Sequence, residues 1–162
     1  MSLLLLVLSI FLACSPGESG ATPTSSTRST YSDDQLRVSV QFPADWQPDP
    51  SNSRRFVGAD GFLQLLGAAG NGAALDAVAN SHATQQLRPF GGNPTISSFV
   101  VDGQPARLIW PSDDQPQAMN KLSEVLIQAP ALIQVGSNSY DYVLLYADSG
   151  HIQQIAQTVQ FS

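Results

Sequence analysis

The tract from Ser15 to Thr30 confines any fold to the residues that follow it. Of its sixteen residues, all but Glu18 and Arg28 are Ser, Thr, Pro, Gly or Ala. Such side chains bury too little apolar surface to offset the entropy of ordering the backbone. We therefore expect a single folded domain over residues 31–162, because a chain with 43% hydrophobic residues and this length supplies one core of ordinary size.

The apolar run before this tract is too short to cross a membrane. From Leu3 to Ala13 the chain is apolar except for Ser9, which makes eleven residues, whereas a spanning helix needs about 20. Such a length is typical of the apolar core of a secretory signal. The sequence FLAC at residues 11–14 resembles the lipobox of bacterial lipoproteins. The resemblance implies a lipoprotein signal peptide over residues 1–13, cleavage between Ala13 and Cys14, and lipidation of the Cys14 sulfur.

Lipidation of Cys14 would decide where the domain works. Two or more acyl chains hold a protein stably on a bilayer, at about 0.8 kcal/mol per buried CH₂. Residues 14–30 would then be the lipidated cysteine and a flexible Ser/Thr/Pro/Gly tether, with the domain on the extracytoplasmic face of the cell membrane, at the cell surface or in the periplasm. The alternative is an ordinary cleaved signal in which Cys14 is a small apolar residue. Because the chain has one cysteine, we expect no internal disulfide.

The charge of the chain argues against a nucleic-acid partner. The net charge is −6, from thirteen acidic and seven basic residues, and Lys121 is the one lysine. This leaves no basic stripe that could neutralise phosphates. We expect the membrane, through the lipid, and a protein or cell-envelope component as partners, and the sequence implies no cofactor.

Alternating apolar residues predict strands and hairpins. Leu36 to Phe42 alternates with a period of two and predicts a half-buried strand that ends at Pro43. Residues 47–53 are rich in Pro, Asp, Ser and Asn and predict a loop. Two hairpins are expected at Asp60-Gly61 and Asp102-Gly103, because glycine accepts the positive φ of tight turns.

Helical spacing appears twice. Residues 73–87 predict a helix with Asn71 as its N-cap and with Leu75, Val78, Ala79, Ala83 and Leu87 on its apolar side. A second helix is expected from Ser149, with Asp148 as its N-cap and an apolar stripe of Ile152, Ile155, Ala156 and Val159. Between them lie the strand YDYVLLY at 140–146 and an apolar segment, 124–128, that stops before Pro130. Residues 116–138 receive no firm assignment.

The order of these elements indicates an α+β fold with six or seven strands, since strands and helices do not alternate strictly. The order of elements and motifs resembles the Mog1/PsbP-like fold, which includes bacterial lipoproteins of the LpqN type. In chain order these are a strand, FPADW, a hairpin, a helix, VVDGQPARLIW, YDYVLLYAD and a terminal helix. The resemblance implies an α/β/α sandwich with a mostly antiparallel sheet flanked by helices. It also implies a non-catalytic module that docks onto other molecules, and it assigns no site residue.

The residue types that carry chemistry are few. His82 and His151 lack a metal-binding spacing and no nucleophile elbow is present, so we name no catalytic and no metal-ligating residue. We expect His82 to lie at the core boundary and His151 to be exposed. The pairs Asp33-Asp34 and Asp113-Asp114 are expected in solvated loops, because neighbouring side chains on an extended chain point apart.

A row of aromatic residues offers a possible ligand platform. Tyr140, Tyr142 and Tyr146 share one side of a strand with Leu144. In a sheet that is covered by helices such a row is more often core, and we favour that interpretation.

We expect a lipid-anchored, non-enzymatic binding domain that uses loops at one edge of the sandwich. The three candidate loops lie around Trp46, over residues 88–94 and over residues 112–117, where exposed Gly, Pro and aromatic positions carry recognition. Their candidate contact residues are Trp46, Arg88, Phe90, Asp113 and Asp114. The alternatives are a small-ligand carrier, with a pocket between sheet and helix, and an unrecognised envelope hydrolase that uses His82 or His151 with a nearby Asp.

Overall fold

A computed structural model describes residues 27–162 of the chain. The predicted signal peptide, the cleavage between Ala13 and Cys14, and the lipidation of Cys14 lie outside the described residues. The first strand, β1, spans Arg28–Asp33, so regular structure begins three residues inside the segment predicted to be a tether. Within the described residues, no helix is long and apolar enough to cross a membrane.

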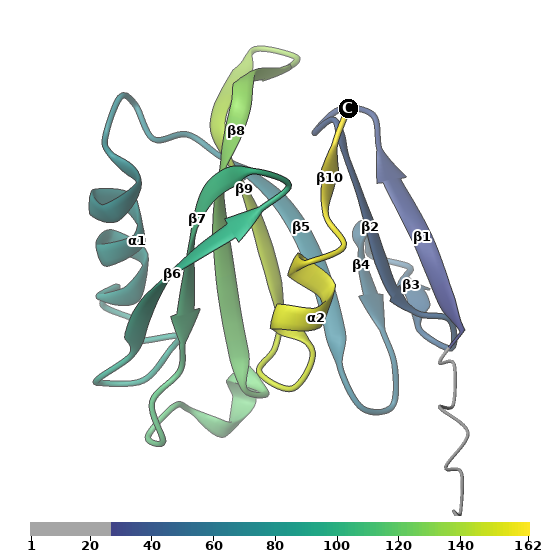
Figure 1. Ribbon diagram of the computed structural model, residues 1–162. Helices are drawn as coiled ribbons and strands as arrows, with labels where there is room; N and C mark the ends of the chain where they lie inside the picture. The colour runs from purple at the N-terminus through teal and green to yellow at the C-terminus, as the bar shows by residue number, and fades with distance from the viewer. Residues whose placement is uncertain (1–26) are drawn as a thin grey trace, which may run out of the picture.

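A seven-stranded antiparallel sheet forms the centre of the domain (Figure 1). Its strands lie in the order β3-β4-β5-β9-β8-β7-β6. Their bounds are β3 Gln47–Asp49, β4 Asn52–Val57, β5 Phe62–Ala68, β6 Thr95–Val101, β7 Gln104–Trp110, β8 Leu122–Val135 and β9 Asn138–Asp148. The long strands β8 and β9 pair along the middle of the sheet, and each is therefore flanked by strands on both edges.

The two faces of this sheet are covered differently. One face carries helix α1, Leu75–Ala83, and the other carries the short helix α2, Ile152–Ala156, together with a three-stranded sheet. The small sheet has the order β1-β2-β10, with β2 Val38–Pro43 and β10 Gln160–Phe161. The predicted α+β sandwich with a mostly antiparallel sheet is confirmed, although sheet as well as helix covers the second face.

Apolar residues alternate between two cores because both faces of the sheet are covered. Val143 and Leu145 of β9 face the larger core beneath β2 and α2, while Tyr142 and Leu144 face α1. Because the residues on both sides of this strand are buried, its sequence is an almost continuous apolar run. This arrangement confirms that Tyr142 and Leu144 belong to the core.

The predicted strand around residues 36–42 and both predicted hairpins are present. Leu36, Val38, Val40 and Phe42 are all buried, as their alternation predicts. The turn at Asp102-Gly103 has φ values of 48° and 75°, whereas Gly61 is outside the positive-φ region. A Cβ atom on Gly61 would collide with the carboxylate of Asp148 and the ring of Trp46. The first hairpin therefore needs glycine for close packing and not for its φ angle.

Several predicted boundaries are wrong. Residues 47–53 hold β3, a turn and the start of β4 in place of a loop. Strand β8 continues through Pro130 to Val135, because a register shift between Gln128 and Ile133 places Pro130 in an irregular stretch where its missing N–H is tolerated. Ten strands are present within residues 27–162, compared with the six or seven expected.

Both helices are shorter than predicted. α1 begins at Leu75 after Ala74, which makes no side-chain cap, and the expected cap Asn71 instead occupies a turn with φ of 50°. The helix ends at Ala83, and Leu87 is 84% exposed in the loop beyond it. α2 has five residues and is capped at His151, not at Asp148. Such short helices are marginal alone, so packing against the sheet stabilises them.

Candidate functional site

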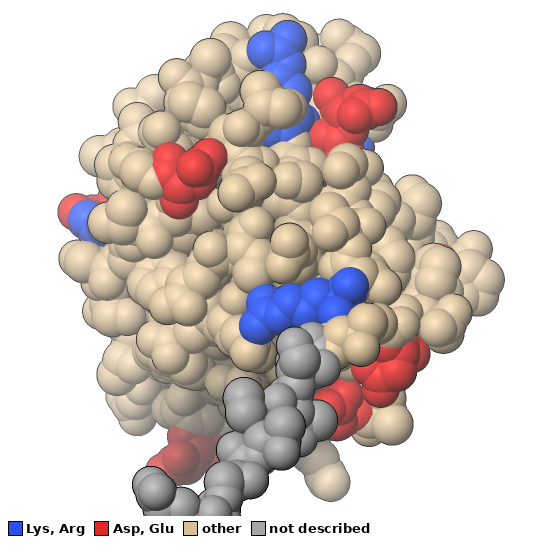
Figure 2. All heavy atoms as spheres, turned by 45° about the vertical axis from the view of Figure 1, so that its right-hand side comes forward, with Lys and Arg blue, Asp and Glu red and all other residues tan. Residues whose placement is uncertain are grey.

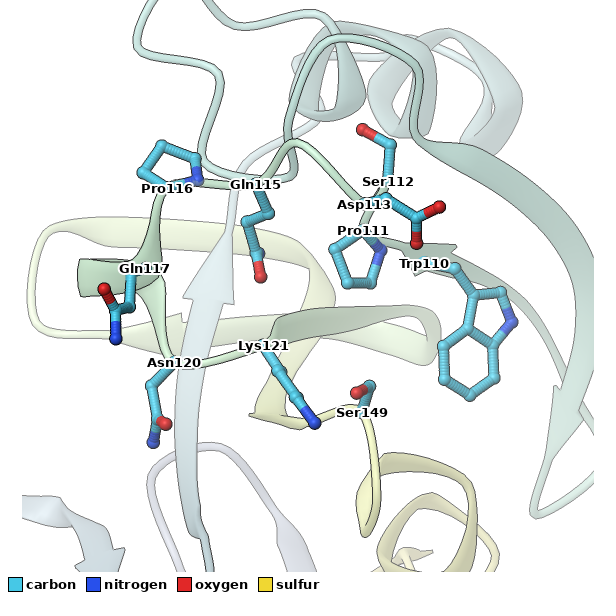
Figure 3. Close-up of a pocket in the computed structure, with 10 residues that line it drawn as sticks. All are labelled: Trp110, Pro111, Ser112, Asp113, Gln115, Pro116, Gln117, Asn120, Lys121 and Ser149. Atoms are coloured by element: carbon cyan, nitrogen blue, oxygen red, sulfur yellow. The ribbon is translucent and has the colours of Figure 1, made fainter.

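A cavity of the described domain lies where β7 ends and β8 begins. It has a volume of about 750 Å³, and we call it the β7–β8 cavity. Trp110 at the end of β7, the connection over residues 111–121 and Ser149 after β9 form its walls (Figure 3). The connection contains a 3₁₀ helix at Gln117–Met119. One of the predicted contact loops, Ser112 to Gln117, thus lines a concave surface.

Backbone and side-chain hydrogen bonds tie this connection to the loop that precedes β6. The Asp114 carboxylate accepts hydrogen bonds from the backbone N–H of Gly92, at 3.0 and 3.1 Å, and from the hydroxyl of Ser112. The Gln115 amide donates to the carbonyls of Pro89 and Leu122. Two of the predicted loops are therefore held together, and the connection after β7 is the one that lines the cavity.

The Asp114 carboxylate connects these two loops through its hydrogen bonds. The hydrogen bond from Ser112 and the backbone N–H of Gly92 hold the pKa of Asp114 below its usual value. Because these donors already occupy the carboxylate, Asp114 holds the connection against the loop that precedes β6. Its neighbour Asp113 is exposed, lines the cavity and accepts no hydrogen bond within residues 27–162, so Asp113 is the acid that is free to meet a ligand.

Two of the five predicted contact residues are buried. Trp46 is 2% exposed and Phe90 is 1% exposed, so the expectation that these aromatic side chains are surface contacts is wrong. The Trp46 indole donates to Asp60 at 3.0 Å and packs beside Phe42, and Phe90 packs in a small core with Ala83 and Ile109. Arg88 is exposed and lines a separate hollow next to α1.

The floor of the β7–β8 cavity is a strained turn. Asn120 and Lys121 have φ values of 50° and 55°, and the Lys121 carbonyl accepts a hydrogen bond from the Ser149 backbone N–H at 2.9 Å. Figure 3 shows the side chains of Lys121 and Ser149 next to each other. Sequence reasoning did not select Lys121, because a backbone angle leaves no signal in composition.

His82 holds α1 against the sheet. Its Nδ1 atom lies 2.7 Å from Oε1 of Glu124, which comes from β8 and is fully buried. The hydrogen bond to Glu124 raises the pKa of His82 and outweighs the opposing effect of burial. The predicted boundary position of His82 is confirmed, but its acid partner is Glu124 where an Asp was expected.

Glu124 is the polar residue that sequence reasoning missed. Its Oε2 atom has no hydrogen-bond partner in the described residues. Burial, followed by the nearby Glu124 carboxylate, raises the pKa of Tyr146 on the adjacent strand. The signal in the sequence was a single acid inside the apolar run SEVLI, and such an isolated acid in a buried strand needs a partner.

His151 is enclosed by acids and an aromatic ring, and its predicted exposure is wrong. Its Nδ1 atom lies 2.8 Å from Oδ1 of Asp148, and its Nε2 atom lies 3.6 Å from Oδ2 of Asp60. The ring meets Trp46 edge-on, with centroids 5.1 Å apart. The Asp148 carboxylate also accepts the backbone N–H groups of Phe62 and Gly150, so this cluster joins α2 to the sheet.

Of the remaining acidic candidates, Asp33 is structural and Asp34 is exposed. Asp33 is 5% exposed and pairs with Arg54, so its predicted place in a solvated loop is wrong. Burial opposes its ionisation, but the Arg54 guanidinium and the Leu36 backbone N–H outweigh burial and lower the pKa of Asp33. Asp34 is exposed, as predicted. Among residues 27–162, no three His, Cys, Asp or Glu side chains are placed to hold a metal ion.

Charged residues are sparse on the face turned toward β1. Figure 2 shows separate patches of Lys or Arg and of Asp or Glu with wide uncharged areas between them. This face has no continuous basic stripe of the kind that tracks a phosphate backbone.

Comparison with known proteins finds a distant structural likeness. No protein-family model matches the chain, and no curated protein matches it. The solution structure of cyanobacterial PsbP (CyanoP) from Synechocystis sp. PCC 6803 is similar to this chain, with 10% sequence identity and a TM-score of 0.41. The match covers 91% of this chain and 98% of that chain. We carry no site residue and no activity over from it.

Proposed function

We propose that this chain is a lipid-anchored, extracytoplasmic, non-enzymatic binding domain that engages a protein or a cell-envelope component. The observation that carries the binding role is the state of the polar side chains in the β7–β8 cavity. Four polar side chains that line this cavity have no side-chain hydrogen bond or ion pair within residues 27–162: Asp113, Gln117, Asn120 and Lys121. Free donors and acceptors that converge on a concave surface favour binding.

The two histidines support a non-enzymatic role. Their ring nitrogens contact carboxylates that join helices to the sheet, namely Glu124 for His82 and Asp148 for His151. Covalent hydrolysis needs a nucleophile within hydrogen-bond reach of the base. Within residues 27–162 neither imidazole is hydrogen-bonded to a hydroxyl group.

The anchor is proposed from the FLAC motif and from the position where the described domain begins. Thr27 pairs with Ala44, next to the β2–β3 turn, at the same end of the sandwich as the connection between β7 and β8 (Figure 1). A lipid on Cys14 would therefore be attached to the cavity end of the domain through a predicted flexible linker of 13 residues. Membership of the Mog1/PsbP-like family, of the LpqN type, is part of this proposal and rests on element order.

Metabolic labelling tests the anchor. The wild-type chain should incorporate radiolabelled palmitate in a bacterial host and enter the detergent phase of a Triton X-114 separation. The Cys14→Ser variant should do neither. Wild-type protein without label would overturn the anchor and leave the binding role to a separate test.

Site-directed photo-crosslinking tests the binding role. A photoreactive residue at Gln117, on the cavity rim, should form a discrete product in the envelope. The matched control is Ser137, an exposed residue in the β8–β9 hairpin at the other end of the sheet. Equal labelling from both positions, or no product from Gln117, would contradict binding at the cavity.

A small-ligand carrier is a second candidate, because Tyr146 lines a cavity of about 280 Å³. This cavity lies between the loop at 118–122 and strands β4 and β5, in place of the expected position between sheet and helix. Arg55 stacks over the Phe62 ring at its edge. Native mass spectrometry of protein from its own host should show an added mass if a ligand is carried there.

A further inference from the structure

Three turns in this domain share an unusual pair of backbone angles. Each has an Asn or Asp with φ near 50°, followed by a second residue with positive φ. In Asn71-Gly72 and Asp102-Gly103 the second residue is glycine, with φ of 79° and 75°, but in Asn120-Lys121 it is lysine, with φ of 55°.

Lysine is a poor choice for this conformation. A residue with a Cβ atom costs roughly 1–2 kcal/mol more than glycine in the left-handed region, which is why glycine usually fills the second position of such turns. The two sister turns follow that rule. The third retains a strained side chain. Arg37 and Arg88 are strained in the same way, with φ of 53° and 45°, so the strain at Lys121 supports a functional role through the cavity that this side chain lines.

The retained side chain belongs to the one lysine of the chain, and it lines the β7–β8 cavity. Lys121 makes no ion pair with residues 27–162. The neutral hydroxyl of Ser149 lies beside it (Figure 3). A free ammonium next to neutral hydrogen-bond donors suits an anionic group.

The other residues of the cavity restrict the chemistry of the uncharged part of the ligand. The Gln117 and Asn120 amides both donate and accept, whereas the Asp113 carboxylate only accepts. An anion beside Asp113 would be repelled, so the ligand must present donors such as hydroxyl groups to that side. Trp110 adds a partly buried aromatic ring at the wall, against which the C–H groups of a ring or polyol can pack.

We propose that the β7–β8 cavity binds an anionic, hydroxyl-bearing ligand, such as an acidic sugar or a polyol phosphate, whose charged group pairs with Lys121. This inference rests on the proposed function, since it names the ligand chemistry for the same cavity. Acidic sugars and polyol phosphates supply the same chemistry, namely one anionic group on a polyhydroxylated body.

Nuclear magnetic resonance of the two tryptophan indoles tests the inference. Full-length, ¹⁵N-labelled chain in detergent micelles is titrated with galacturonic acid and with glycerol phosphate, and with neutral galactose and glycerol as matched probes. The Trp110 indole signal should shift saturably with at least one acid, and the Trp46 signal should stay fixed because that side chain is buried. We expect the neutral probes to bind at least about tenfold more weakly, as loss of one charge-assisted hydrogen bond predicts.

Lys121→Gly separates binding from folding. It should weaken binding of the responding acid at least about tenfold, yet raise the melting temperature by about 2–4 °C, because relief of strain exceeds the entropy cost of glycine. The control is Arg37→Gly, which removes an exposed cation at a φ of 53° in the turn between β1 and β2. Arg37→Gly should stabilise the domain similarly and leave binding unchanged.

The outcomes distinguish this inference from the proposed function. A response to galacturonic acid alone identifies a carboxylate ligand, and a response to glycerol phosphate alone identifies a phosphate ligand. Equal binding of acidic and neutral probes, or undiminished binding by Lys121→Gly, overturns the anion site while the cavity still binds. If the Trp110 indole signal does not shift with any probe, the inference is also overturned. The crosslink from Gln117 then tests the proposed function independently. A lower melting temperature for Lys121→Gly removes the strain argument and overturns the inference.

Discussion

The polar side chains of this domain differ between its interior and the β7–β8 cavity. In the interior His82, His151 and Trp46 all contact carboxylates from other elements. In the cavity Lys121 and Gln117 have no such partners within residues 27–162. Residue types that usually suggest catalysis thus stabilise the fold here, and ordinary surface residues supply the free hydrogen-bonding groups. The contrast predicts that interior changes alter stability and that cavity changes alter binding.

The largest effect is expected from breaking the interior pair. His82→Ala leaves Glu124 buried without its partner, which should lower the free energy of unfolding by about 3 kcal/mol. The double variant His82→Ala/Glu124→Leu removes the unpaired carboxylate and should recover much of that loss. Urea unfolding measures both. A His82→Ala variant as stable as wild type would remove the structural role of this histidine.

The pH dependence of stability tests the same pair without a mutation. The pKa of His82 is raised above its ordinary value of 6.5 in the folded state. Protonated His82 therefore contributes stability that is fully present below pH 6.5 and is lost as the pH rises through the higher folded pKa. Urea midpoints measured from pH 5.5 to 9 should fall with pH in wild type. The double variant should lack this component, and an identical slope in both proteins would contradict the assignment.

A smaller effect on stability is expected when the lysine of the Asn120-Lys121 turn is copied into another turn of the same kind. Gly103→Lys places lysine in the turn at Asp102-Gly103, where a new Cβ atom meets nothing within 4 Å. The cost should come from the backbone alone and should be about 1 kcal/mol, measured by thermal unfolding. The Gln117 crosslink should be unchanged. A neutral or stabilising Gly103→Lys would show that these turns tolerate lysine and would weaken the contrast with Lys121.

The sequence predicted those strands and turns whose own residues show an apolar alternation or a turn motif. The alternation around Val38 and the Asp102-Gly103 turn are encoded within a few residues, so both were found. β3 and β10 were missed because they are short and exist through pairing, as in Phe161 opposite Val38. The extension of β8 past Pro130 was missed because the register shift that accommodates proline depends on β9.

The candidate site was predicted in part. Composition identified the loop at Ser112–Gln117, which lines the β7–β8 cavity. It also selected Trp46 and Phe90, because aromatic residues among Pro and Gly suggest an exposed loop, but distant segments bury both side chains. Lys121 was missed because its distinction lies in the φ angle and in its neighbour Ser149, and neither can be obtained from local sequence.

The most direct test compares two stably folded variants by the yield of the Gln117 crosslink. One replaces both histidines, His82→Gln/His151→Gln, and the other changes the cavity, Trp110→Ala/Lys121→Gly. We predict that the histidine variant keeps the crosslink although it unfolds at lower urea, and that the cavity variant loses it. A folded histidine variant that loses the crosslink while the cavity variant keeps it would contradict the account.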